Sequence, residues 1–441
     1  MATSRTVCLS PGQPASTIIF LLILLIAMVP RIIFMLGVSN EEFLSIDGAD
    51  YRNLSDNLAA GRGYVISHYR WFEPEPANSP AYHPELFRPP LLPWCGAALK
   101  LLGVDWLSAA RVTAILLGCA LVFAVGFLGK TLFGYRAGAL SALAFAIYPY
   151  AVHYSCRWST ETLFSLLLVT GAALLARGAK SEDARYLALG TLSLALASLA
   201  RPIGLAFAII LPTIVLMRLT PRNRARPILA CVLVLFLVLI PWTVRNYRLT
   251  NQVSPSTYFG PYNIWLGMNQ GMDEMYRAGS TPRFAERLDQ LYQKDLKHHI
   301  NELETKRIYS VTDQQSYWLK ETVKHVNDNP RSAIYILSKR LAHFFRPWPN
   351  RSVVSPLAWW VSAITVSMLF ALSLISLVRY PKFRSHHLLV PMGLAILVSL
   401  PFVFHLRFRF PSFEPFVVVI AAAGIVEATR GRFRCVEKLP R

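Results

Sequence analysis

The sequence predicts an all-α polytopic membrane protein with about ten transmembrane helices and a mostly helical outer-face subdomain. Hydrophobic residues make up 54% of the 441 residues and charged residues only 16%. The hydrophobic residues also gather in long runs, which a soluble multidomain chain does not contain. The net charge of +20 does not indicate nucleic-acid binding, because Lys and Arg fall mostly between the hydrophobic runs, as membrane topology requires.

The first predicted span is Thr17–Gly37, which is long enough to cross a bilayer. It lacks a small-residue cleavage site and has only Arg5 before it, so we expect an uncleaved transmembrane helix rather than a signal peptide. Apolar runs predict the other spans at Trp106–Leu128, Ala137–Tyr154, Thr160–Ala176, Tyr186–Ala200, Ile203–Met217, Ile228–Val244, Pro356–Val378, Leu388–His405 and Ser412–Thr429. The runs Tyr186–Ala200 and Ile203–Met217 are short, and Arg201–Pro202 separates them.

Basic residues in alternate short loops indicate the orientation. They are Lys130, Arg136, Arg177, Lys180, Arg185, Arg218, Arg222, Arg224, Arg226, Arg379, Lys382 and Arg384, with Arg430, Arg432, Arg434, Lys438 and Arg441 in the tail. The positive-inside rule places this side in the cytoplasm. We therefore expect a multi-pass protein of the cytoplasmic (inner) membrane with both termini inside.

These spans divide the chain into regions. An N-terminal transmembrane region, residues 17–244, contains an outer loop at 38–105. Residues 245–355 form an outer, periplasmic subdomain, largely helical from Arg283 to Phe345 and broken at Asn329–Pro330. The C-terminal transmembrane helices follow at 356–429 and a basic cytoplasmic tail at 430–441.

The outer loop contains the stretch Ile46–Tyr64, which predicts a short helix just outside the membrane. Asp47 suits its N-cap, apolar residues then recur at helical spacing, and two glycines, Gly61 and Gly63, end it. Residues three apart share a helix face, so Asp47 and Asp50 are expected close together. Pro90–Leu102, later in the loop, predicts a short amphipathic segment at the interface.

Several stretches occur in a distinctive order: DGADYRNLSDNLAAGRGY, RPPLLPW, STETLF, LARP, PWTVRN, GPYNIWLGMN and RFRFPSFEP. This order resembles the bacterial GT-C glycosyltransferases of the family 39 type, relatives of protein O-mannosyltransferases and of the lipid A aminoarabinose transferase. The resemblance covers residues 17–429. Those families often carry two adjacent acids, whereas Gly48 and Ala49 separate Asp47 from Asp50 here. Which aspartate has the family role therefore stays open.

The resemblance implies transfer of a sugar from a polyprenyl-phosphate donor to a cell-envelope glycan, lipid or protein at the outer membrane face, with inversion. Asp47 or Asp50 would be the general base. Five cations are candidates for the donor phosphate: Arg88, Arg201, Arg245, Arg407 and Arg409. Candidate substrate-binding residues are Glu161, Tyr258, Tyr262, Asn263 and Trp265. Membrane lipids surround such an enzyme.

Simpler roles remain for these residues. Asp47 could act only as a helix cap, and Arg201 could be a snorkelling side chain at the end of a span. The aromatic residues could be interface anchors. Glu161 suits the first turn of a span, although acids within membranes usually face a cavity. We expect no metal and no cofactor besides the lipid-linked sugar, because no His/Cys ligand spacing is present. The six cysteines are expected as packing residues, and a Cys95–Cys156 bridge is not favoured.

Two other classes of function fit the sequence less well. A transporter or flippase of lipid-linked glycans requires polar groups or broken helices near mid-membrane in two related halves. Here the acids cluster at one face, and no matching halves are recognisable. A non-catalytic scaffold leaves the outer acids without a role. The sequence therefore favours an enzyme.

Overall fold

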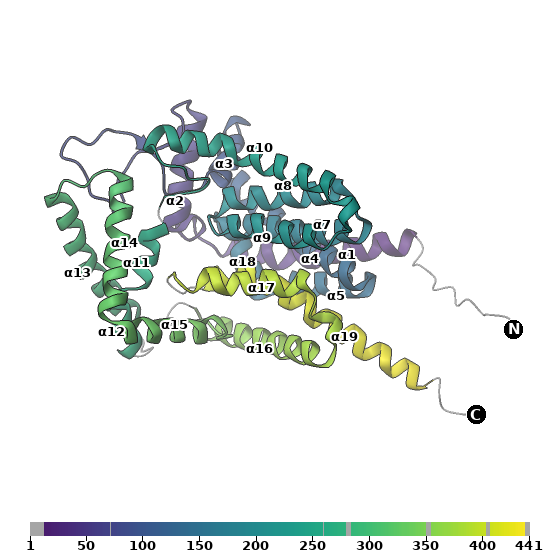
Figure 1. The fold of residues 1–441 in the computed structure, drawn as a ribbon. Helices are drawn as coiled ribbons and strands as arrows, with labels where there is room; N and C mark the ends of the chain where they lie inside the picture. Colours follow the sequence, from purple (N-terminus) through teal and green to yellow (C-terminus); the bar gives the residue numbers. More distant parts are fainter. Residues whose placement is uncertain are drawn as a thin grey trace.

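The computed structural model describes residues 13–70, 72–258, 260–278, 284–349, 354–402 and 406–436. These residues are mostly helical, and the predicted all-α polytopic class is confirmed (Figure 1). Two short strands, β1 (Val65–Ile66) and β2 (His83–Pro84), pair antiparallel within the outer loop. Arg5, His405, Lys438 and Arg441, named above, lie outside the described ranges, as do Cys8 and Arg283.

Within the described ranges, five helices are long and apolar enough to cross a membrane. They are α1 (Gln13–Leu36), α4 (Trp106–Phe133), α7 (Thr160–Ser181), α10 (Ala225–Thr250) and α16 (Pro356–Arg379). Shorter apolar helices are α3 (Leu91–Leu101), α8 (Ala184–Ala200), α9 (Gly204–Met217) and α17 (His386–Ser399). Helix α18 (Leu406–Ser412) and helix α19 (Glu414–Val436) complete the C-terminal region. A helix therefore occupies each apolar run that the sequence marks.

One predicted span differs in the structure. The run Ala137–Tyr154 is two helices, α5 (Tyr135–Ala146) and α6 (Pro149–Ser155), not one. Proline lacks an amide hydrogen and disfavours helical geometry in the residue before it. Tyr148 accordingly has extended backbone angles, φ −66° and ψ 122°, and Pro149 takes the first position of α6.

The outer subdomain is helical, as predicted. Its helices are α11 (Gly260–Gly267), α12 (Gln270–Ala278), α13 (Phe284–Thr305), α14 (Val311–Asp328) and α15 (Pro330–Phe344). The break at Asn329–Pro330 is confirmed, because Asn329 leaves helical geometry and Pro330 begins α15. Helix α10 runs on to Thr250, past the start of the predicted subdomain. Phe72 of the first outer loop stacks on Tyr262 of α11, with 4.8 Å between ring centroids, so loop and subdomain pack together.

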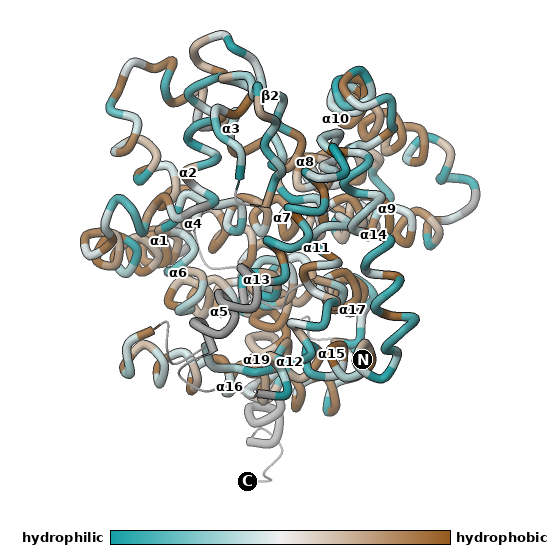
Figure 2. The backbone as a smooth tube through the Cα atoms, turned by 90° about the vertical axis from the view of Figure 1, so that its left-hand side faces the viewer, coloured by the Kyte–Doolittle hydropathy of each residue, from teal (hydrophilic) through white to brown (hydrophobic). Residues whose placement is uncertain are grey.

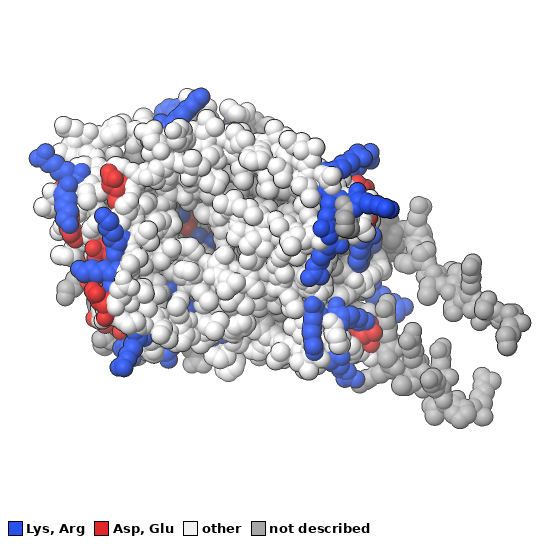
Figure 3. Space-filling view, in the orientation of Figure 1, with Lys and Arg blue, Asp and Glu red and all other residues white. Residues whose placement is uncertain are grey.

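Charged side chains gather at two ends of the molecule and leave an uncharged band between them (Figure 3). We call the end formed by α2 and α11–α15 the subdomain end. The opposite end, where α1 starts and α19 finishes, is the basic end (Figure 1). Viewed from the subdomain end, hydrophilic residues follow α14, whereas α17 is mainly hydrophobic (Figure 2). This distribution suits a protein whose central band lies in lipid.

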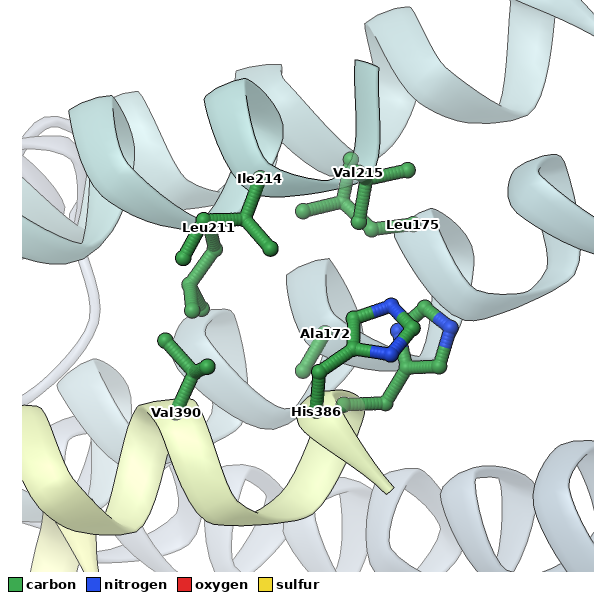
Figure 4. A pocket seen from close by; sticks show the side chains of 8 residues that line it. Ala172, Leu175, Leu211, Ile214, Val215, His386 and Val390 are labelled. Carbon is green, nitrogen blue, oxygen red and sulfur yellow. The ribbon is translucent and has the colours of Figure 1, made fainter. Parts of the chain in front are cut away.

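A small hollow opens toward the basic end between α7, α9 and α17 (Figure 4). Apolar side chains form most of its wall, and His386 and His387 stand at the start of α17 beside it. It lies away from the acids of the outer loop, because its α7 residues, Ala172 and Leu175, belong to the second half of that helix.

Candidate active site

Helix α2 (Asn40–Ala59) carries both aspartates of the outer loop. It begins at Ser39, which forms a capping box with Glu42. The helix is interrupted at Ser45, which has φ 52° and ψ −176°. Asp47 therefore lies in the first turn after the kink, and the predicted N-cap role is wrong. Its carboxylate instead binds two guanidinium groups.

Helix α2 ends where the sequence predicts. Gly61 and Gly63 have φ values of 75° and 85°, which side chains other than glycine rarely adopt. The chain can therefore turn sharply after Ala59 and return as β1 beside α2. This turn places the first outer loop over the two aspartates.

Asp47 joins two distant parts of the chain. Its Oδ1 accepts a hydrogen bond from Arg88 Nη2 at 2.6 Å, and its Oδ2 accepts one from Arg407 Nη2 at 2.5 Å. Arg88 precedes α3 in the first outer loop, and Arg407 lies in α18 near the end of the chain. Two predicted phosphate ligands thus lie against a predicted base.

Asp50 lies one turn further along α2 and is 6% exposed in its side chain. Its Oδ2 accepts hydrogen bonds from Arg70 Nε and Arg88 Nε, each at 2.9 Å. Its Oδ1 lies 3.0 Å from His68 Nε2. Arg88 therefore bridges Asp47 and Asp50, and the prediction that these carboxylates lie close together is confirmed.

Glu161 extends the same network from the first turn of α7, where its side chain is 1% exposed. Its Oε1 lies 2.7 Å from Arg201 Nη1 and 2.7 Å from Arg407 Nε. Arg407 thus connects Glu161 with Asp47. We call this set the ion-pair network: Asp47, Asp50, Arg70, Arg88, Glu161, Arg201 and Arg407.

Packing at Gly48 explains how α2 reaches α7. A Cβ atom on Gly48 would lie 2.8 Å from the backbone oxygen of Trp158, which shortly precedes α7. The amide of Trp158 also donates a hydrogen bond to the Phe43 carbonyl at 2.8 Å. The glycine between the two aspartates therefore permits the close approach that places Asp47 beside the start of α7.

Glu85 orders the loop that holds the arginines. This buried carboxylate pairs with Arg70 and accepts hydrogen bonds from the amides of Phe87 and Arg88, at 2.5 and 2.7 Å. Glu73 pairs with Arg70 as well. Sequence reasoning missed His68, Arg70, Glu73 and Glu85, because they lie in irregular backbone where no periodicity marks a shared face. Their density in one outer loop was the available signal.

The guanidinium groups determine the charge of the aspartates. Burial favours the neutral carboxylic acid, but Arg88 and Arg407 outweigh it and hold the pKa of Asp47 well below its ordinary value. The pKa of Asp50 is lowered in the same way by Arg70 and Arg88, against the effect of burial. Both aspartates are therefore ionised at neutral pH.

The other predicted arginines lie outside the network. Arg245 donates a hydrogen bond to the Tyr64 carbonyl at 3.1 Å and lies over the Trp242 ring. Arg409 is fully buried, pairs with Glu414 at 2.6 Å, and donates to the Phe344 carbonyl at 2.9 Å. Arg245 thus supports the first outer loop from α10, and Arg409 fastens α18 to the end of α15.

The predicted aromatic residues are buried. Tyr258, Tyr262 and Trp265 are 7%, 2% and 3% exposed. The Tyr258 hydroxyl donates to the Gln252 carbonyl at 2.6 Å, while Tyr262 and Trp265 pack against Trp318 in the subdomain. Asn263 is partly exposed on α11. Tyr262 and Trp265 thus contribute to packing in the subdomain, and Tyr262 also contacts Phe72 of the loop.

The His, Cys, Asp and Glu side chains bear on metal binding and on disulfides. Within the described ranges, no group of three or more His, Cys, Asp or Glu side chains is arranged to hold a metal ion. The cysteines whose side chains are described, Cys95, Cys119, Cys156 and Cys231, are free thiols.

Comparison with known proteins places this geometry in context. Residues 87–244 match the family model of dolichyl-phosphate-mannose-protein mannosyltransferases. A search of curated proteins gives no match. The archaeal oligosaccharyltransferase AglB from Archaeoglobus fulgidus, in complex with an inhibitory peptide and a dolichol-phosphate, covers 96% of this chain at 13% identity with a TM-score of 0.57. The apo form of the A. fulgidus oligosaccharyltransferase covers 97% at 14% identity with a TM-score of 0.56. This chain has a GT-C type fold.

The resemblance to GT-C glycosyltransferases is thereby confirmed at the level of the fold. The chain spans about half the length of the oligosaccharyltransferase chains it matches, 52% in both structures. ArnT from Cupriavidus metallidurans bound to undecaprenyl phosphate is also similar, at 15% identity over 98% of this chain and 82% of that one, but the TM-score of 0.39 is too low to support an argument. The family match includes Arg88, Glu161 and Arg201 and ends before α18.

Proposed function

We propose that this GT-C protein is a membrane glycosyltransferase that moves a sugar from a polyprenyl-phosphate-linked donor to a cell-envelope acceptor. The observation that carries the proposal is the ion-pair network, in which carboxylates of α2 and α7 meet arginines of the first outer loop and α18. A reaction that forms a phosphate leaving group needs cations, and an attacking hydroxyl needs a base; the network contains both. The dolichol-phosphate bound to AglB supports a lipid-linked donor.

In the proposed reaction, a hydroxyl of the acceptor attacks the anomeric carbon on the side opposite the lipid phosphate. The bond to the phosphate breaks as the new glycosidic bond forms, so the anomeric configuration inverts. Asp47 accepts the proton of the hydroxyl. Arg407 and Arg201 stabilise the negative charge that develops on the departing phosphate.

In this proposal, donor binding makes Asp47 a stronger base. Asp47 has a low pKa because Arg88 and Arg407 hold its charged form. A donor phosphate that recruits either guanidinium group removes a stabilising contact from the carboxylate. The pKa of Asp47 then rises and the carboxylate becomes a stronger base. The Asp47 carboxylate would thus become more basic when the donor is bound.

The acceptor would approach from the subdomain end, since the network lies on that side of the uncharged band. An envelope lipid, glycan or protein has the required hydroxyl. We further propose that this end faces out of the cytoplasmic membrane, because basic residues gather at the opposite end, as the positive-inside rule requires.

Exchange of each aspartate for asparagine tests the proposal. Asp47→Asn keeps the size of the side chain and removes its charge, so we expect a loss of about 100-fold or more in turnover of a polyprenyl-phosphate sugar. Asp50→Asn should reduce turnover less, because three partners hold Asp50 as a support for Arg88 and Arg70. Donor binding and membrane insertion are measured in parallel.

Asp105→Asn is the matched control. Asp105 caps α4 by accepting a hydrogen bond from the Ser108 amide at 2.8 Å, and asparagine caps helices equally well. Its turnover should therefore equal that of the unaltered protein. Near-normal turnover in both Asp47→Asn and Asp50→Asn would refute the catalytic role of α2.

A further inference from the structure

A second concentration of charge lies at the basic end, away from the ion-pair network. A hollow of about 270 Å³ opens between the last turns of α4 and α7. The residues that line it are Phe127, Lys130, Thr131, Arg177, Lys180 and Ser181. Three of the six are cations, and none is an acid.

The cations of this hollow lack the internal partners that the network provides. Among the described residues, no ion pair involves Lys130, Arg177 or Lys180. Lys180 donates to the Thr131 carbonyl, and Arg177 lies over the Tyr186 ring with 4.6 Å to its centroid. These contacts position the two side chains and leave their charges uncompensated.

The nearest acids in the sequence have other partners. Glu182 accepts hydrogen bonds from Asn223 at 2.6 Å and Thr220 at 3.2 Å. Asp183 caps α8 by accepting one from the Arg185 amide at 2.8 Å. Topology rules and helix dipoles favour cations at this end. They do not require three cations to converge on one hollow, where like charges repel unless an anion separates them.

The chemistry of the wall suits a phosphate group. Lysine ammonium groups bind phosphate as point charges, and an arginine binds two of its oxygens in parallel. The Ser181 hydroxyl donates to the Arg177 carbonyl at 3.1 Å, so the three cations are the donors of this wall. The hollow therefore has the donors that a singly or doubly charged phosphate ester requires.

An apolar face leads from the hollow toward the uncharged band. Phe127 lines the hollow, and Phe123 lies one turn earlier on α4. Phe123 stacks on Phe20 of α1 with 4.6 Å between ring centroids, and Phe20 is 49% exposed. Acyl chains attached to a phosphate in the hollow would run along these rings. A free phosphate would leave them uncovered.

We propose that this hollow binds the phosphate headgroup of an anionic phospholipid. Cationic pockets between helices at the membrane surface have the geometry for such headgroups. The site is separate from the proposed reaction, so its occupant is a structural lipid and not the donor. It would fasten the ends of α4 and α7 to the lipid leaflet on the basic side.

The test measures the binding of phosphatidylglycerol to the full-length protein in neutral detergent, by thermal unfolding during lipid titration. Lys130→Met, Arg177→Met and Lys180→Met are combined in one variant, which keeps the apolar stems and removes the charges. Each cation should contribute about fivefold to affinity, and the triple variant should bind about 100-fold more weakly. The matched control removes three exposed cations of the same end that do not line the hollow: Arg136→Met, Arg185→Met and Arg222→Met.

The proposal predicts stabilisation by phosphatidylglycerol in the unaltered protein and the control, and its loss in the hollow variant. Phosphatidylcholine and inorganic phosphate should give no comparable stabilisation. An equal effect of inorganic phosphate would identify a free-anion site and overturn the lipid assignment. Equal weakening in both triple variants would show diffuse charge attraction, and unchanged binding in the hollow variant would exclude the site.

Discussion

The cations at the two charged ends of the molecule differ in burial and in their ion-pair partners. At the subdomain end, Arg70, Arg88 and Arg201 are between 5% and 11% exposed in their side chains and pair with carboxylates. At the basic end, Lys130 and Arg177 are exposed and have no acidic partner among the described residues. A buried charge needs a fixed partner, whereas an exposed one interacts with solvent or lipid. The first end therefore suits the proposed reaction, and the second suits the proposed contact with lipid.

The same difference determines whether a phosphate must compete with carboxylates for the cations at each end. Under the proposed function, a phosphate that enters the ion-pair network must compete with carboxylates already paired to the arginines. A phosphate at the basic end meets cations without a competitor. Donor recognition and lipid association would thus depend on different residues, and the two can be altered independently.

The largest expected effect is that reporters fused to the two ends signal from opposite sides of the membrane. Reporters fused after Lys180, Arg224 and Lys382 should signal from the cytoplasm, and one near Gln290 should signal from outside, because basic loops stay inside. An alkaline phosphatase and green fluorescent protein pair gives an all-or-none result. A cytoplasmic signal at Gln290 would reverse the orientation and move the proposed reaction to the other side.

The second largest expected effect is the loss of stability when a buried ion pair is broken. Glu414→Ala leaves Arg409, 0% exposed, without its carboxylate and should cost about 3–5 kcal/mol of unfolding free energy. Glu427→Ala breaks a pair with Lys382 that is about half exposed on the lysine, and should change stability by less than about 1 kcal/mol. Thermal unfolding in one detergent compares the two. Similar losses would show that burial does not separate these pairs.

Substitution of an arginine inside the ion-pair network should weaken donor use more than substitution of one outside it. Arg201→Ala and Arg407→Ala should each weaken donor use by about 1.5–3 kcal/mol, roughly 10- to 100-fold, because a charge-assisted contact to phosphate is lost. Arg245→Ala should have a smaller effect, since Arg245 contacts Tyr64 and Asn246 instead. KM and kcat for a polyprenyl-phosphate sugar provide the measurement. A greater loss at Arg245 than at Arg201 would place the phosphate along α10.

The smallest expected effect is a pH dependence of the subdomain. Burial lowers the pKa of His299 and His325, and it lowers the pKa of His343 to about 4. The unfolded chain takes up protons near pH 6.5 while these folded histidines stay neutral. The stability they contribute is thus present above about pH 6.5 and is lost as the pH falls.

Thermal unfolding of the protein at pH 7 and pH 5 measures this loss. The melting temperature should be lower by a few degrees at pH 5, and His343→Gln should reduce the difference. An unchanged melting temperature would show that these histidines are accessible to protons in the folded protein.

Local signals predicted much of the fold. Long apolar runs specified most of the spans, Pro330 begins α15 as predicted, and Gly61 and Gly63 end α2. The helix start at Pro149 was missed, although proline is the local signal for it. The kink at Ser45 escaped prediction, because serine does not favour a positive φ and only tertiary packing holds it there. Local sequence could not reveal it.

The site was predicted in part for the same reason. The spacing of Asp47 and Asp50 on one helix placed them together, and Arg88 followed from its nearness in the same loop. The bridge from Asp47 through Arg407 to Glu161 joins α2, α18 and α7, and no periodicity connects residues so far apart in the sequence. Arg409, two residues from Arg407, looked equivalent and lies in a different environment.

The close contact at Gly48 limits how this protein can be redesigned. Any larger residue there brings a side-chain carbon against the Trp158 carbonyl, a backbone atom that cannot rotate away. An engineer who moved the second acid to this position, to recreate the adjacent pair of the related families, would push α2 off α7. The separation of the two acids by two residues is thus part of the packing, and a library of variants should leave position 48 fixed while it samples the loop after Ala59.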